Sequence, residues 1–95
     1  VTPTTAVPPF PIEEIYPKEI NGVRMADYIQ WALPTYAFTV IGVPAISVPC
    51  GFTKSGLPVG LQIAGRWRDE ATVLAAAAAF ERARPWARVR PPEPA

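Results

Sequence analysis

The 95-residue sequence contains no histidine and a single cysteine, Cys50. Ser-His-Asp and Cys-His catalytic centres need an imidazole beside the nucleophile, so this chain alone cannot supply either of them. The usual zinc sites are excluded on the same ground, because they take their ligands from several cysteines and histidines. One cysteine cannot form an internal disulfide, and we expect a cytoplasmic protein.

Phosphate-binding glycine motifs, a strong net charge and a membrane span are also missing. Neither G-x-G-x-x-G nor G-x-x-x-x-G-K-[ST] occurs. The formal net charge is only +1, which gives no general attraction to nucleic acid or to anionic membranes. The longest uncharged stretch, residues 28–53, is interrupted by prolines and does not resemble a membrane helix. We therefore expect no cofactor, no metal, no nucleic-acid partner and no membrane span.

Proline is abundant instead, with 13 residues in the chain. Each proline removes a backbone donor, and such a chain often lies across a larger body that satisfies its other backbone groups. Residues 1–20 carry five of the prolines and predict an extended, polyproline-like surface arm, which could begin with a short strand. Because 49% of the residues are hydrophobic, the chain is not disordered by composition and can bury a core.

Residues 24–41 read as a helical and apolar segment. Residues 24–33 predict a helix with Met25 and Ile29 on one face, which Pro34 interrupts or kinks. Residues 35–41 are apolar and rich in β-branched and aromatic types. They could form a strand or a short second helix, because periodicity over so few residues does not separate the two.

Residues 45–64 predict a strand pair, with strands at 45–50 and 58–64 joined by a turn that contains glycine. Pro49 and Pro58 place each strand at a sheet edge or at a bulge. Gly60 and Gly65 indicate close backbone approach or a bend.

Residues 70–84 give the clearest secondary-structure prediction, a helix. Asp69 is a good N-cap, the alanine-rich run has high helix propensity, and Pro85 ends the pattern. Val73, Ala77 and Phe80 form one apolar stripe. Together with the strand pair, this helix predicts an α/β fold.

Four consecutive motifs carry a specific likeness to other proteins. They are TPTT at 2–5, G-x-P-A-x-S-x-P-x-G at 42–51, G-L-P-x-G-L-Q at 56–62 and D-E-A-x-x-L at 69–74. In this order they resemble the C-terminal end of amidase signature enzymes, and the likeness is weakest at residues 12–35. The resemblance implies that residues 1–95 are the C-terminal part of an α/β/α sandwich with a mixed sheet.

The resemblance also implies a reaction. The family hydrolyses amide C–N bonds through a Ser nucleophile, a second Ser on a cis peptide and a Lys base, and it uses no metal. These residues lie in a Gly/Ser-rich region upstream of the part that this chain resembles. Here serine occurs only at Ser47 and Ser55, and lysine only at Lys18 and Lys54, none of them in that context. No catalytic residue is therefore assigned.

The expected role is that of scaffold and pocket wall in an amidase that acts on a small amide. The amidase core would be its partner, in the same or a separate chain, and the isolated chain would be inactive. Exposed sheet edges would make it poorly soluble, oligomeric or partly unfolded. A start at Val1, inside the TPTT motif, favours a fragment. The alternatives are a stand-alone binding or assembly module and part of a glutamine-dependent amidotransferase subunit; without histidine, a Cys50-based enzyme is remote.

Aromatic residues before the strand pair are the candidates for a substrate pocket. Tyr28, Trp31 and Tyr36 could line a pocket for an aryl or alkyl amide, although core packing is the more common role of such a cluster. Ser47 and Cys50 lie three positions apart, so in a regular strand they point to opposite faces. We expect Ser47 to bond to the backbone and Cys50 to be a small buried packing residue.

Overall fold

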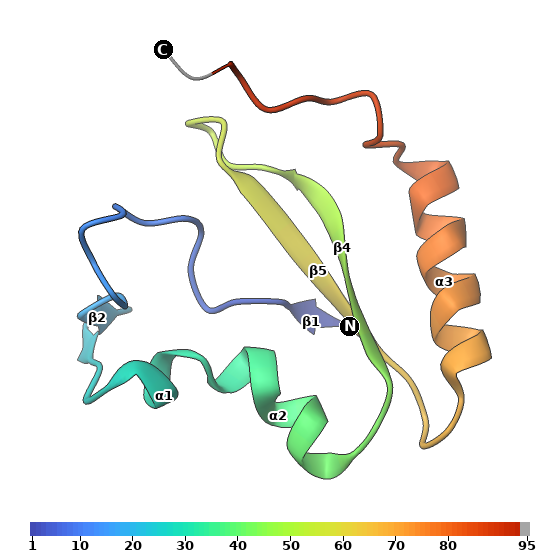
Figure 1. Cartoon of the computed structure of the whole chain (residues 1–95), viewed down its shortest axis with the longest axis horizontal. Helices are drawn as coiled ribbons and strands as arrows, with labels where there is room; N and C mark the ends of the chain where they lie inside the picture. The colour runs from blue at the N-terminus through green and yellow to red at the C-terminus, as the bar shows by residue number, and fades with distance from the viewer. Residues whose placement is uncertain (94–95) are drawn as a thin grey trace.

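A β-hairpin lies at the centre of the computed structural model, which describes residues 1–93 (Figure 1). It consists of β4 (Ala45–Phe52) and β5 (Pro58–Ala64), paired antiparallel with Ile46 opposite Ile63. The short strand β1 (Thr2–Pro3) adds to the other side of β5, which gives the strand order β1-β5-β4. The strand pair expected at 45–64 is confirmed.

A β-bulge interrupts β4 next to its proline. The pairing passes from Pro49 opposite Gly60 to Gly51 opposite Val59, so that Cys50 has no partner in the ladder. Pro49 has no N–H to donate, and a bulge accommodates the missing bond. The proline at position 49 predicted this irregularity. Beyond the bulge, the side chains of β4 no longer follow the strict alternation between the two faces of the sheet.

Helix α3 (Glu70–Ala83) packs against one face of the hairpin (Figure 1). The Asp69 carboxylate caps it by accepting from the Thr72 N–H at 3.3 Å. Ala77 is buried against the hairpin core and Phe80 packs at its side, while Val73 is buried next to Gly65, directly after β5. The predicted helix and its apolar stripe are confirmed, and the observed end lies one residue before the expected one.

The segment between the arm and the hairpin differs from the prediction. Strands β2 (Glu19–Ile20) and β3 (Val23–Arg24) form a small antiparallel hairpin whose turn places Asn21 and Gly22 at φ 50° and 78°. An Asn-Gly pair favours this kind of turn because both residues tolerate positive φ. The helix expected at 24–33 is therefore shortened to α1 (Tyr28–Trp31).

Helix α2 (Leu33–Ile41) resolves the open choice at residues 35–41 in favour of a helix. Pro34 lies in its first turn, where a backbone N–H has no intrahelical hydrogen-bond partner in any case. The proline therefore starts a helix rather than breaking one. Gly42 ends α2 with φ 78°, and its N–H donates to the carbonyl oxygen of Phe38 at 3.1 Å.

The hairpin thus has a different neighbour on each face. Its apolar side chains Ile46, Val48, Leu61 and Ile63 meet α3, whereas the side chains that alternate with them contact the arm and the start of α2. The α/β fold class is confirmed. Within residues 1–93, no helix has both the length and the apolar composition that crossing a membrane requires.

We expect Val73→Ala to lower the free energy of unfolding by about 2 kcal/mol, because it removes apolar side-chain area that is buried against the sheet. The neighbouring Leu74 is 61% exposed, so Leu74→Ala should change it by less than about 0.5 kcal/mol. Urea denaturation at one fixed protein concentration, followed by helical circular dichroism, measures both. Equal losses in the two variants would contradict the packing of α3 described above.

Candidate functional site

An aromatic cluster joins the arm to α1. The rings of Tyr28 and Trp31 lie edge to face with centroids 5.7 Å apart, and Phe10 of the arm meets Trp31 in the same way at 5.5 Å. Tyr16 completes the cluster beside Tyr28 at 6.4 Å. Of the three predicted pocket residues, Tyr28 and Trp31 are therefore in contact, and Tyr36 lies on α2, half-buried.

The indole nitrogen of Trp31 is buried and has no hydrogen-bond partner among residues 1–93. Buried polar groups in proteins are nearly always paired, because leaving one unpaired costs its full desolvation penalty. The N–H of Trp31 is thus an unpaired donor enclosed by the aromatic cluster.

A cavity of about 370 Å³ lies between the arm and α2. The arm forms one wall with Thr2, Pro3, Thr5 and Ala6, and α2 forms the other with Pro34, Ala37 and Phe38. None of these seven side chains is charged, so the cavity suits an uncharged, mostly apolar group. Tyr28, Trp31 and Tyr36 are not among its lining residues. The sequence did not indicate this cavity, because its walls come from segments about 30 positions apart.

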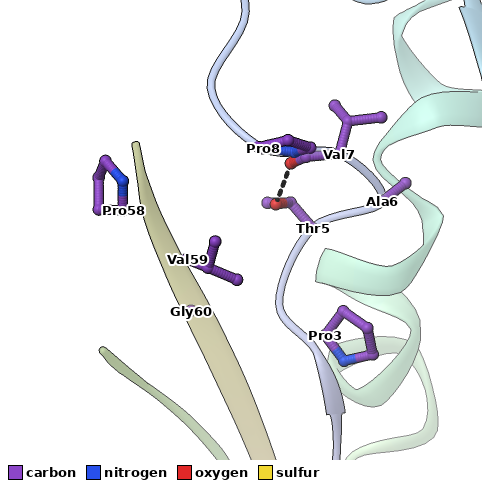
Figure 2. Close-up of a pocket in the computed structure, with 8 residues that line it drawn as sticks. All are labelled: Pro3, Thr5, Ala6, Val7, Pro8, Pro58, Val59 and Gly60. Atoms are coloured by element: carbon purple, nitrogen blue, oxygen red, sulfur yellow. Dashed lines mark hydrogen bonds between the residues drawn. The ribbon is translucent and has the colours of Figure 1, made fainter. Parts of the chain in front are cut away.

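The other side of the arm faces the first residues of β5 across a smaller hollow of about 220 Å³. Figure 2 shows Val59 pointing from β5 into this space, opposite Thr5 and Pro8 of the arm. The Thr5 hydroxyl donates to the carbonyl oxygen of Val7 at 2.9 Å, which fixes the local turn of the arm (Figure 2). The arm therefore has open space on both sides and depends on a few bonds for its position.

Ser47 provides one of these bonds. Its hydroxyl lies 2.6 Å from the hydroxyl of Thr4, so the prediction that Ser47 bonds to the backbone is wrong. The N–H of Thr4 donates to the carbonyl oxygen of Gly60 at 3.2 Å. A Cβ at Gly60 would lie 2.9 Å from the Thr4 hydroxyl oxygen and 3.0 Å from that of Ser47, so the close approach predicted for Gly60 is present.

Cys50 has no catalytic surroundings. Its thiol donates to the carbonyl oxygen of Val59 at 3.4 Å, and the residue is half-buried rather than buried as expected. Ser47 and Cys50 have different partners, so they do not act as a pair. In the described part of the chain, no three His, Cys, Asp or Glu residues come together in a way that could hold a metal ion.

Comparison with known proteins identifies the family. The family model described as Amidase matches residues 1–74. The chain belongs to the amidase signature family. It is 45% identical over 91 residues to an acylamidase of Rhodococcus erythropolis, covering 96% of this chain and 19% of that protein. It is 44% identical over 94 residues to one of the subunits of the glutamyl-tRNA(Gln) amidotransferase of Thermodesulfovibrio yellowstonii, covering 96% and 18%.

The fold agrees with that of a solved amidase signature enzyme. A bacterial aryl acylamidase superposes with a TM-score of 0.77 and 40% sequence identity, over 88% of this chain and 18% of that one. The resemblance seen in the motifs is confirmed, and the α/β architecture is that of part of an amidase signature enzyme. The chain spans about a fifth of the length of the relatives it matches.

We expect Ser47→Ala to speed hydrogen exchange at the Thr4 amide by about fivefold, because losing one hydrogen bond of about 1 kcal/mol loosens the arm. Ser55, the other serine, bonds Thr53 at 2.9 Å in the β4–β5 turn and serves as the control. Ser55→Ala should leave the Thr4 amide unchanged. An unaltered exchange rate in Ser47→Ala would show that the contact does not hold the arm.

Proposed function

We propose that this chain works as the C-terminal scaffold and pocket wall of an amidase that hydrolyses small amides. The Ser-cisSer-Lys chemistry would come from an amidase core in the same or a separate chain, and residues 1–95 alone would be inactive. The observation that carries the proposal is the match to acylamidase at 45% identity over 96% of this chain but only 19% of the relative. A nucleophile, base and oxyanion donors must be assembled together for catalysis.

The surface of the chain supports a large protein partner. Val40 and Ile41 on α2 are 75% and 67% exposed, and Leu74 on α3 is 61% exposed. Several large apolar side chains exposed on helices are typical of an interface, whereas one alone is ordinary. The outer edge of β4 offers backbone groups for an amidase core to bond. Without that core, the same surfaces would make the chain associate with itself.

The proposed substrate is an amide with an aryl or alkyl group. The cavity between the arm and α2 has no charged lining residue. The cluster around Tyr28 and Trp31, which directly precedes α2 in the sequence, adds aromatic surface. Tyr36 would extend this surface on α2. Similar proteins carry the names acylamidase, aryl acylamidase and fatty acid amide hydrolase, which fit such a substrate.

A role within a glutamine-dependent amidotransferase is the second candidate, supported by 44% identity to one of the subunits of such an enzyme. Glutamine carries a charged amino and carboxylate group, and its binding favours charged or strongly polar partners. The apolar lining of the cavity therefore favours the amidase. A stand-alone binding module that pairs through the β4 edge is the remaining alternative.

The test is a chimera in which this chain replaces the matching residues of the Rhodococcus erythropolis acylamidase. Release of 4-nitroaniline from 4-nitroacetanilide measures amide hydrolysis. We expect the chimera to be active, and both the isolated chain and the acylamidase truncated before the junction to be inactive. A folded but inactive chimera would contradict the scaffold role, and hydrolysis by the isolated chain would contradict its dependence on a core.

We expect Trp31→Ala in this chimera to raise KM for bulky anilides by about threefold to tenfold, because it removes aromatic surface from the proposed pocket wall. Trp67, which is 68% exposed on the loop before α3, provides a matched control. Trp67→Ala should leave KM unchanged. If Trp31→Ala and the parent chimera had identical kinetics on short and bulky amides, Trp31 would not be part of the pocket.

A further inference from the structure

Among the described residues, Gln62 is the one polar residue that is buried, and only 6% of its surface is exposed. It lies in the middle of β5, directly opposite Thr2 in the β1–β5 ladder. Its neighbours Leu61 and Ile63 point to the α3 face, so Gln62 points to the face that carries the arm and α2. A buried amide in a strand needs hydrogen-bond partners, and here both come from other elements.

The side-chain nitrogen of Gln62 donates two hydrogen bonds. One goes to the hydroxyl oxygen of Thr2 at 3.2 Å, and the other goes to the carbonyl oxygen of Pro34 at 3.0 Å. Thr2 belongs to the arm wall of the 370 Å³ cavity, and Pro34 belongs to its α2 wall. One amide group on the rigid sheet therefore holds both walls of the same cavity.

Among the hydrogen bonds of residues 1–93, only one other links the arm directly to α2. The Thr35 hydroxyl donates to the carbonyl oxygen of Thr4 at 3.0 Å. The bond to Pro34 needs an N–H donor on residue 62, because a backbone carbonyl can only accept, whereas the Thr2 hydroxyl can donate or accept. The amide of Gln62 thus fixes how far the arm stands from α2.

We propose that Gln62 is a positioning residue that sets the separation of the cavity walls and thereby the size of the acyl group that the enzyme accepts. This inference rests on the proposed function, and it names a specificity determinant that lies outside the cavity lining. An uncharged alkyl or aryl acyl group is the ligand class, because the lining residues carry no charge. A short acyl group would make few contacts with the two walls, whereas a longer one would fill the space between them.

The acylamidase chimera carrying Gln62→Glu tests this, with two probes that differ only in acyl length. These are 4-nitroacetanilide and N-(4-nitrophenyl)hexanamide, both of which release 4-nitroaniline. Glutamate keeps the size of the side chain, and its ionised form offers no donor, so at a pH where it is ionised it repels the Pro34 carbonyl and parts the walls. We expect KM for the hexanoyl probe to rise about tenfold, KM for the acetyl probe to change less than about twofold, and kcat for both to stay within about threefold.

Gln30, the other glutamine, provides the matched control. Its side-chain oxygen accepts from the Ala26 N–H, so Gln30→Glu makes the same chemical change without losing its bond. It should leave both KM values unchanged. Thr2 gives a second, gentler test on an edge residue. Thr2→Val, which lacks the hydroxyl but keeps the size of the side chain, should shift the hexanoyl KM in the same direction as Gln62→Glu.

The outcomes separate this inference from the proposed function. A chimera without activity overturns the proposed function, and the role of Gln62 falls with it. An active chimera in which Gln62→Glu and Thr2→Val leave the ratio of the two KM values unchanged overturns the role of Gln62 alone. A fall in kcat/KM that is equal for both probes also overturns it, because that is the effect of lost folding stability rather than of cavity width.

Discussion

The alternation of side chains along the β4–β5 hairpin determines where the arm, the start of α2 and helix α3 lie. One face presents Ile46, Val48, Leu61 and Ile63, and burial of this apolar area holds α3 in place. The other face presents Ser47, Gly60 and Gln62, and it holds the arm and the start of α2 through hydrogen bonds. A shift of the hairpin register by one residue would exchange these faces and separate both neighbours from the sheet.

The two faces stabilise the fold in different ways. Burial against α3 is non-directional and tolerates small adjustments of the side chains. The polar face depends on individual donors and acceptors, such as the hydroxyl pair of Ser47 and Thr4 and the amide of Gln62, whose geometry is specific. The polar face is therefore suited to setting the shape of a cavity, while the apolar face provides the stability on which that shape rests.

Local patterns in the sequence were sufficient for the elements whose partners are close along the chain. The strand pair at 45–64 and the helix at 70–83 follow from alternation, proline and glycine positions and the Asp69 cap. Local signals at Asp27 and at Asn21-Gly22 also mark the start of α1 and the turn before it, and the helical period of residues 24–33 obscured them. Nothing local indicated the contact of Thr4 with Ser47 or of Gln62 with Pro34, because each depends on how distant segments meet.

We propose that this chain acts together with an amidase core, and the mass of the native protein provides a direct test. The protein is purified from its source without denaturant, and its mass is measured before and after denaturation. The account predicts a denatured mass several times the 10.3 kDa of this chain, or a native complex in which a 10.3 kDa polypeptide is bound to a second one. A free species of 10.3 kDa under both conditions would contradict it.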